Sequence, residues 1–187
     1  MRRVTYAMSV SLDGFIVDVD GKFDWGEPDA EVFRFWIDQT RKLGVHLLGR
    51  RLYETMLYWD TAEQDFSLSA AEREWTALWL ALPKVVFSTS LTSAQGNARL
   101  AAGGLADEIT RLRAERTGGD IAIGGATLAT AAADLGLIDE YHVMVYPVLV
   151  GGGISFFPQH ERHVDLELME TRTFGAQVVW TRYQVTR

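Results

Sequence analysis

The stretch DIAIGGATLATAAADLGLIDEYHVMVYPVLVGGG, residues 120–153, joins a short apolar run, a pair of glycines, a run of small residues and a second long apolar run. Asp120–Ile123 has the length and composition of a strand that is buried on both faces. Gly124 and Gly125 allow a tight bend, and a helix is expected to open at Thr127. The order of these segments predicts a β-α-β unit and therefore an α/β fold.

The bend in this unit is also a candidate ligand site. A helix that begins directly after a strand directs free N–H groups and the positive end of its dipole toward whatever lies above the sheet. This arrangement favours an anion such as phosphate, and glycines let the anion approach the backbone closely.

The composition limits the possible functions. A chain of 187 residues, 48% hydrophobic and 23% charged, predicts one globular domain with a sizeable core. A net charge of −7 argues against nucleic acids and anionic membranes as partners, because both need a basic surface. The chain has no cysteine, so a disulfide framework and a thiolate zinc site are excluded. No apolar stretch reaches the roughly 18 residues of a membrane span, and a cytoplasmic protein is expected.

The first third of the chain predicts a strand, a loop and a helix. Val4–Val10 reads as a strand, and the residues from Ser11 to Gly14 break it before a short apolar run. Asp29 is expected to cap a helix. The face that this helix turns to the sheet is predicted to consist of Phe33, Trp36, Ile37 and Thr40.

The remaining elements follow from the same signals. Ser69 and Glu72 form a capping-box pattern before a helix that Pro83 ends, and Trp75 and Trp79 within it are expected in the core. The other expected helices cover 52–57 and a segment with Leu105, Ile109 and Leu112. The other expected strands are Val45–Leu48, Lys84–Phe87, Tyr141–Val150, Val164–Met169 and Gln177–Val185. The last two are expected to form an antiparallel pair.

Three strand ends carry chemistry that suits phosphate: 49–51 with two arginines, 88–90 with three hydroxyls, and the glycine bend at 124–127. Each alone is more often a tight turn or a capped helix. Ligands of open α/β sheets collect at the carboxyl ends of strands, so together the three turns predict a cleft for an extended ligand with several phosphates, such as a dinucleotide.

Five motifs in order resemble a known family. They are SLDGFI at 11–16, LGRRLYE at 48–54, VVFSTSL at 85–91, IGGATLA at 123–129 and YPVLVGGG at 146–153. Together they resemble the dihydrofolate-reductase-like fold, and most of all the C-terminal reductase domain of the bifunctional riboflavin-biosynthesis deaminase-reductase and its stand-alone bacterial relatives. The resemblance covers nearly the whole chain. It implies a three-layer α/β/α fold, a mostly parallel central sheet with antiparallel C-terminal strands, and a homodimer.

The resemblance also implies an NADP(H) site. The residues that match the family's phosphate-binding turns are Gly49, Arg50, Arg51, Ser88, Thr89, Ser90, Gly124, Gly125, Ala126, Thr127 and Leu128. The positions that match those near the nicotinamide are Ser9, Ser11 and Ile16. The physical chemistry agrees, because the arginine fork suits a phosphate dianion and hydroxyls can donate to it.

Two departures from the family bear on the substrate. The folate-binding acid of dihydrofolate reductases falls on Phe33, whose phenyl ring cannot hold a pteridine by paired hydrogen bonds. Without cysteine the chain has no Cys-containing zinc deaminase site. The expected acceptor is therefore a small molecule other than dihydrofolate, and pterin-like and ribosylamino-pyrimidine-like compounds both stay open.

Asp13 is the candidate catalytic residue, which would orient or protonate the acceptor. The alternative is an Asx-turn residue before Gly14. Trp25 and Tyr146 are candidate walls of the acceptor pocket, with a loop anchor and core packing as the alternatives. His46 and His142 lie in expected strands and are predicted to be satisfied structural histidines, and His160 with His163 lacks the partners of a metal site, so no bound metal is expected.

The sequence thus predicts an NADPH-dependent oxidoreductase that transfers a hydride to a small acceptor. Two alternatives stay open: a nucleotide-binding regulatory or interaction protein without redox turnover, and a weak dihydrofolate reductase.

Overall fold

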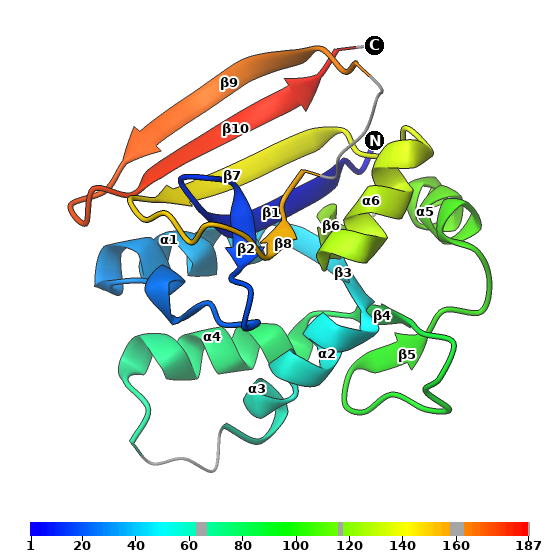
Figure 1. Ribbon diagram of the computed structural model, residues 1–187. Helices are drawn as coiled ribbons and strands as arrows, with labels where there is room; N and C mark the ends of the chain where they lie inside the picture. Colours follow the sequence, from blue (N-terminus) through cyan, green and yellow to red (C-terminus); the bar gives the residue numbers. More distant parts are fainter. Residues whose placement is uncertain (63–66, 116–117, 158–162, 187) are drawn as a thin grey trace.

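The computed structural model describes residues 1–62, 67–115, 118–157 and 163–186. Its centre is an eight-stranded sheet with the order β5-β4-β3-β6-β1-β7-β10-β9 (Figure 1). The strands are β1 Val4–Ser11, β3 Leu43–Gly49, β4 Lys84–Phe87, β5 Ala98–Leu100, β6 Asp120–Gly124, β7 Glu140–Tyr146, β9 Leu166–Thr173 and β10 Val179–Val185. The first six in this order run parallel, whereas β10 is antiparallel to β7 and β9. The predicted fold class is confirmed.

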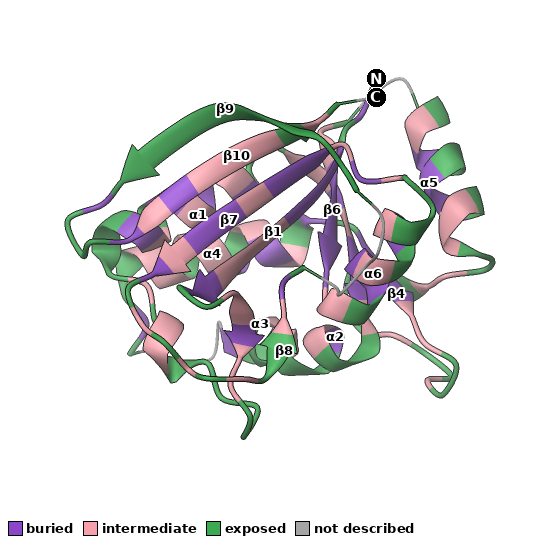
Figure 2. Cartoon of the chain, turned by 45° about the horizontal axis from the view of Figure 1, so that its top comes forward, coloured by how far each residue is buried: buried purple, intermediate pink, exposed green. Residues whose placement is uncertain are grey.

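Helices cover both faces of the sheet (Figures 1 and 2). One face packs against α5 Leu105–Ala114 and α6 Ala126–Asp134, and the other against α1 Ala30–Thr40 and α4 Ala70–Ala81. The short helices are α2 Arg50–Met56, α3 Tyr58–Thr61 and the 3₁₀ turn η1 Asp24–Gly26, and a separate two-stranded sheet joins β2 Phe15–Val17 to β8 Ile154–Ser155.

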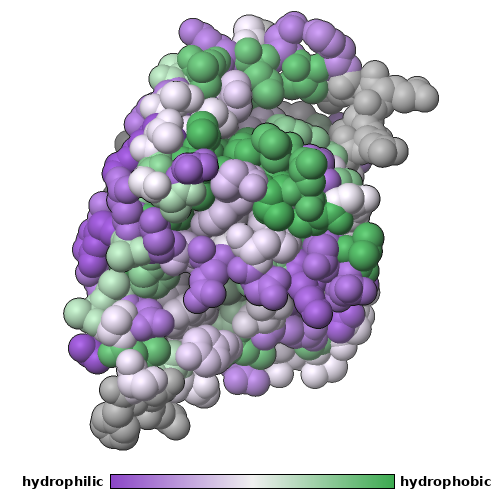
Figure 3. Space-filling model, turned by 60° about the vertical axis from the view of Figure 1, so that its left-hand side comes forward, coloured by the Kyte–Doolittle hydropathy of each residue, from purple (hydrophilic) through white to green (hydrophobic). Residues whose placement is uncertain are grey.

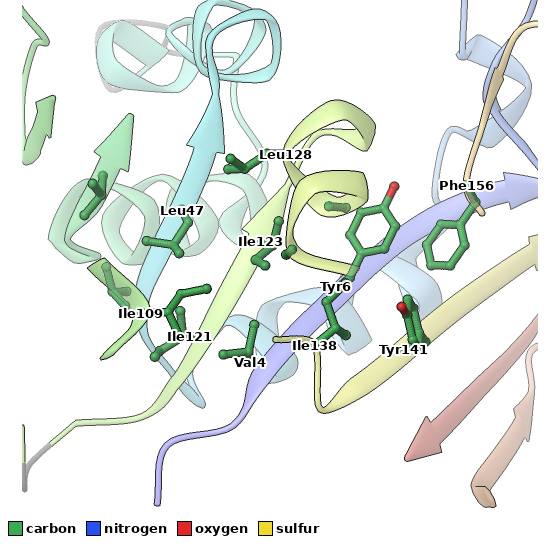
Figure 4. Packing of buried hydrophobic residues seen from close by; sticks show 14 of the residues in the cluster. Val4, Tyr6, Leu47, Ile109, Ile121, Ile123, Leu128, Ile138, Tyr141 and Phe156 are labelled. Carbon is green, nitrogen blue, oxygen red and sulfur yellow. The ribbon is translucent and has the colours of Figure 1, made fainter. Parts of the chain in front are cut away.

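The main core lies on the α5 and α6 side. Val4, Tyr6 and Val10 of β1 point into it, together with Leu47 and Ile121 from the neighbouring strands. Figure 4 shows Val4, Tyr6, Leu47 and Ile121 gathered with Ile109 of α5, Leu128 of α6 and Phe156. Because side chains alternate along a strand, the residues between them face α1 and α4.

The predicted helix ends are confirmed at two places. Asp29 Oδ1 accepts the Val32 N–H at 2.8 Å at the start of α1. The Ser69 hydroxyl accepts the Glu72 N–H, and the Glu72 carboxylate accepts the Ser69 N–H, as the capping box requires.

The predicted inner face of α1 is partly wrong. Val32 and Phe35 are buried with Ile37 and Thr40, whereas Phe33 and Trp36 are only half-buried. The reason is that α1 packs on α4 as well as on the sheet. The Phe33 ring contacts Trp75 of α4 with a centroid separation of 6.0 Å, so the helix has two covered sides.

Other differences concern two strands. β5 lies in a segment where the sequence predicts no strand, and β7 ends at Tyr146 rather than at Val150. The chain leaves the sheet after Tyr146, and further along Gly151, Gly152 and Gly153 all have positive φ. In the described ranges, none of the helices combines the length and the hydropathy that a bilayer crossing needs.

Strand β9 forms one edge of the sheet, and all 8 of its residues are exposed (Figure 2). They include Leu166, Leu168 and Met169. Figure 3 shows apolar side chains gathered in the upper half of one face, the half of the molecule that holds β9 and β10.

Leu47→Ala tests the position of the main core. Leu47 is fully buried in the middle of the sheet, so the change is expected to lower the free energy of unfolding by about 2–5 kcal/mol. Leu149→Ala is the matched control, because Leu149 is 69% exposed. Urea denaturation of both variants measures the difference, and equal losses would contradict this assignment of the core.

Candidate functional site

The three predicted phosphate turns lie at one edge of the sheet. Strands β4, β3 and β6 are parallel neighbours, and their last residues pair: Gly49 with Phe87, and Leu48 with Gly124. The turns at 49–51, 88–90 and 124–127 therefore follow strands that end side by side. The structure brings the predicted turn residues together.

Two of these turns approach each other closely. A Cβ atom added to Gly125 would lie 3.8 Å from the Gly49 amide nitrogen, and Gly125 has φ +99°. A Cβ atom on Gly124 would lie 2.6 Å from Leu52 Cδ2 and 2.8 Å from His46 Nε2. The glycine pair is therefore required by the packing of strand ends as well as by the turn itself.

The helices that start here have free N-termini. α2 follows Gly49 and α6 follows Gly125, and neither has a side-chain cap or an acidic residue in its first turn. By contrast, α1 and α4 are capped by side chains, and α5 carries Asp107 and Glu108 in its first turn. Among the helices of the described ranges, the two at the glycine turns combine a first turn without a side-chain cap with an electrostatic field that suits an anion.

The basic and hydroxyl residues of the turns differ in availability. Arg50 and Arg51 are exposed; Arg50 bonds Glu54 at 3.3 Å, and Arg51 has no ion pair within the described ranges. The Ser88 hydroxyl accepts the N–H groups of Ser90 and Leu91 and so builds its own turn. Thr89 and Ser90 are exposed at the edge.

Three other predicted residues turn their side chains inward. Leu128 is 8% exposed and Ile16 is 8% exposed, both in the main core. The Ser11 hydroxyl is buried and accepts the Phe15 N–H at 3.0 Å. A ligand can reach these residues mainly through their backbone, whereas Ala126 is half-buried and Thr127 is exposed.

Asp13 contacts backbone rather than a cavity. Its carboxylate accepts the N–H groups of Val150 at 3.2 Å and Gly151 at 2.7 Å. The Ser11 side chain and these amides lower the pKa of Asp13, so the group is a carboxylate at neutral pH. A proton donor needs the opposite shift. These contacts favour the orienting role of Asp13, through the glycine loop, over the protonating one.

A pocket of about 400 Å³ lies between the sheet and helices α1 and α4. Its floor consists of the β1 residues that alternate with the core, Thr5, Ala7 and Ser9, together with Ala122 of β6. These side chains are too small to fill the space between the sheet and the helices. Ser9, Leu52 and Met56 place one end of the pocket beside the edge where the glycine turns meet.

Four tryptophans line the pocket: Trp36, Trp75, Trp79 and Trp180. Trp75 and Trp79 stack with an interplanar angle of 12° and a centroid distance of 6.2 Å. The expectation that they are core residues holds for Trp79, which is 2% exposed. Both also contribute to the pocket wall, which the sequence reasoning missed.

His46 lines the pocket between Trp79 and Gly124. Its ring meets Trp79 edge to face at 5.7 Å, and its Nδ1 is buried without a hydrogen-bond partner in the described part of the chain. The prediction of a satisfied histidine is therefore wrong for His46. Burial lowers the pKa of His46 to about 4, and the nearby Lys84 charge adds to this effect, so the imidazole is uncharged at neutral pH.

The far end of the pocket is polar and paired. Glu140, which is 2% exposed, accepts from Arg3 at 2.8 Å and Arg182 at 3.4 Å, and lies 2.9 Å from His142 Nε2. The prediction of a satisfied structural histidine is confirmed for His142. Burial alone would raise the pKa of Glu140, but His142 and the two arginines outweigh burial and lower it.

The remaining candidates lie elsewhere. Trp25 and Tyr146 contact each other edge to face at 6.2 Å, and Tyr146 belongs to the core under α1 rather than to the pocket. His163 bonds Asp165 at 2.8 Å on the surface, and His160 lies outside the described residues. Across the described ranges, His, Asp and Glu side chains form no group of three that could bind a metal.

Comparison with known proteins finds one family model that matches nearly the whole chain. The family described as "RibD C-terminal domain" matches residues 2–180. The uncharacterized protein YyaP of Bacillus subtilis (strain 168) is 29% identical over 183 residues, which cover 97% of this chain and 94% of that protein.

Solved structures share the fold. A putative riboflavin biosynthesis protein from Shewanella sp. PV-4 superposes with a TM-score of 0.78 at 24% identity over 100% of both chains. A diaminohydroxyphosphoribosylaminopyrimidine deaminase/5-amino-6-(5-phosphoribosylamino)uracil reductase from Thermotoga maritima gives a TM-score of 0.66 at 12% identity, over 99% of this chain and 57% of that chain.

Glu140→Gln tests the ion pairs at the far end of the pocket. The pKa of Glu140 is lowered in the folded state. The Glu140 carboxylate therefore stabilises the folded protein at pH values above the unfolded pKa of about 4.3, and this stabilisation is lost as the pH falls through the folded pKa. The variant is expected to be less stable by about 2 kcal/mol at pH 7.

The difference from the unchanged protein should shrink below the pH at which free glutamate titrates. Thermal unfolding from pH 3 to pH 8 measures it. Glu167→Gln is the control, because Glu167 is exposed on β9. A loss that does not vary with pH would contradict the assigned ion pairs.

Proposed function

The chain belongs to the RibD C-terminal domain family, and we propose that it is an oxidoreductase that uses NADPH to reduce a small acceptor. The observation that carries the proposal is the junction of two sites. Two glycine turns with free helix N-termini meet at one sheet edge, and a tryptophan-lined pocket opens beside them. A coenzyme at the edge would place its reactive ring at the end of the acceptor pocket.

The residues present fit NADPH. The first-turn amides of α6, beginning with Ala126, and the glycine pair suit the pyrophosphate. Arg51, with Thr89 and Ser90 on the adjacent strand end, suits the 2′-phosphate. The acidic first turn of α5 would repel a phosphate from the next position along the edge, which favours the same placement.

The coenzyme and the protein are proposed to have separate roles. When bound, the reduced nicotinamide supplies a hydride, and one proton completes the reduction of the acceptor. The chain holds the acceptor between the sheet and helices α1 and α4, where the tryptophans exclude water. Ser9 lies on the pocket floor at the end nearest the glycine turns and is proposed to contact both ligands.

The acceptor of the Thermotoga maritima protein, as its name states, is a phosphoribosylamino-uracil, and that protein is also a deaminase. Pterin-like and ribosylamino-pyrimidine-like acceptors are both carried forward for this chain. Dihydrofolate is disfavoured, because Phe33 at the position of the folate-binding acid packs on Trp75. A homodimer stays part of the proposal on the strength of the family resemblance.

One assay distinguishes the proposed function from its alternatives. NADPH binding followed by its oxidation with a panel of pteridines, quinones, aldehydes and sugar phosphates is the expected result. Binding without oxidation by any acceptor would favour a regulatory or interaction protein, and oxidation with dihydrofolate alone would favour a weak dihydrofolate reductase.

Arg51→Gln tests the choice of coenzyme. Loss of a charged partner for the 2′-phosphate is expected to weaken NADPH binding by roughly tenfold or more and to leave NADH binding nearly unchanged. Titration calorimetry with both coenzymes measures the effect. Arg34→Gln is the matched control, because Arg34 is an exposed arginine of α1 paired with Glu74. Equal affinity for NADPH and NADH, unaffected by Arg51→Gln, would refute the assignment.

Asp13→Ala tests the positioning role. Without the carboxylate, the backbone at Val150 and Gly151 loses its hydrogen bonds to the loop after β1, so the KM for the acceptor is expected to rise while NADPH affinity stays the same. Asp20→Ala in an exposed loop is the control. Unchanged turnover and unchanged acceptor affinity would remove Asp13 from the site.

A further inference from the structure

We infer that the acceptor is a planar, uncharged ring without a phosphate group. The inference rests on the proposed function, because it assigns the acceptor to the pocket beside the coenzyme edge. It narrows the acceptor class and sets this chain apart from a reductase of phosphorylated substrates.

The walls of the pocket select a flat ligand. Trp36 comes from α1, Trp75 and Trp79 come from α4, and Trp180 comes from β10. Along β1, the lining residues that alternate with the core, Thr5, Ala7 and Ser9, have side chains no larger than threonine, and Met8 of the same strand also lines the pocket. A pocket lined by tryptophan side chains and by small side chains favours flat aromatic ligands over branched or puckered ones.

The charges of the pocket lining cancel. The cationic side chains are Arg3, Lys42 and Arg182, and the acidic ones are Asp120, Glu140 and Glu170. Arg3 bonds Asp120 and Glu140, and Arg182 bonds Glu140 and Glu170. Lys42 Nζ bonds the neutral Gln39 amide oxygen at 3.1 Å on the surface.

A phosphate in this pocket would have to compete with carboxylates. Drawing Arg3 or Arg182 toward a ligand phosphate would leave the buried Glu140 short of its partners, and a buried unpaired charge is costly. The anion-binding features lie instead at the sheet edge, where Arg51 and the starts of α2 and α6 face no carboxylate of their own first turns. The molecule therefore separates its phosphate chemistry from its acceptor pocket.

The polar groups near the coenzyme end suit a neutral ring. Ser9 and His46 line this part of the pocket, and the uncharged His46 imidazole can donate or accept a hydrogen bond but offers no cation to an anionic ligand. A heterocycle with ring nitrogens or carbonyl oxygens would find partners here.

A matched pair of fluorescent probes tests the inference. 2-Naphthol is planar and uncharged at neutral pH, and 2-naphthyl phosphate adds only the phosphate. Fluorescence titration with the NADP⁺-saturated protein is expected to show that 2-naphthol binds tighter by about tenfold or more. The phosphate would be desolvated beside Arg3 and Arg182, which carboxylates already hold, and the third lining cation, Lys42, lies on the surface.

Two variants assign the binding to the pocket. Ala7→Leu fills the floor and Trp36→Leu removes one wall, and both are expected to weaken 2-naphthol binding by about tenfold. The matched controls are Ala131→Leu on the exposed side of α6 and Phe23→Leu in an exposed loop, which should bind the probe like the unchanged protein.

The outcomes separate this inference from the proposed function, since NADP⁺ binding is measured first and independently. Equal or tighter binding of 2-naphthyl phosphate would overturn the inference while the coenzyme site stands. Absence of 2-naphthol binding, or binding that Ala7→Leu and Trp36→Leu leave intact, would overturn it as well. Absence of NADP⁺ binding would instead refute the proposed function.

Discussion

The alternation of side chains along β1 is the constraint on which the rest of the molecule depends. Val4, Tyr6 and Val10 point toward α5 and α6, where Tyr6 stacks on Phe156 at 4.3 Å, and they form the main core. Thr5, Ala7 and Ser9 point the other way and are too small to fill the space under α1 and α4. One face of the sheet thus carries the main core, and the opposite face holds two smaller buried clusters with a pocket between the sheet and helices α1 and α4.

The parallel arrangement of β4, β3, β6 and β1 separates the phosphate-binding edge that we propose from the pocket. The carboxyl ends of these four strands lie at one edge of the sheet. Backbone amides from separate turns therefore lie close together there without any long-range side-chain network. The edge is suited to phosphate because of helix N-termini and arginines. The pocket that opens next to it is suited to a flat ring because of tryptophans. Neither region has to serve both kinds of chemistry.

Much of this architecture is predictable from local signals. Asp29 and the Ser69–Glu72 pair are read directly as caps, and the glycine pair at 124–125 marks the strand-to-helix bend. The order of short apolar strands and helices predicts a parallel sheet, which in turn places the glycine turns at one edge. These features depend on a few adjacent residues, so no knowledge of distant contacts is needed.

The features that escape prediction depend on residues far apart in the chain. Phe33 and Trp36 are assigned to the wrong face, because α4 covers a second side of α1. Asp13 is predicted to orient or protonate the acceptor, and its contact with Gly151, 138 positions away, is not visible in the sequence. The pocket was missed because its floor and walls come from separate elements, although the small and polar residues that alternate with the core along β1 were a signal for it.

Strand β9 is an edge strand, so its outer row of backbone amides and carbonyls faces solvent. Its exposed apolar side chains Leu166, Leu168 and Met169 make this edge prone to association. Glu167, Glu170 and Arg172 interrupt this apolar run. Without these charges, an exposed apolar edge strand would pair with extended segments of other molecules, and each added strand would present a new edge. The charged side chains between the apolar ones make edge-to-edge pairing into fibrils unfavourable when the protein concentration is high.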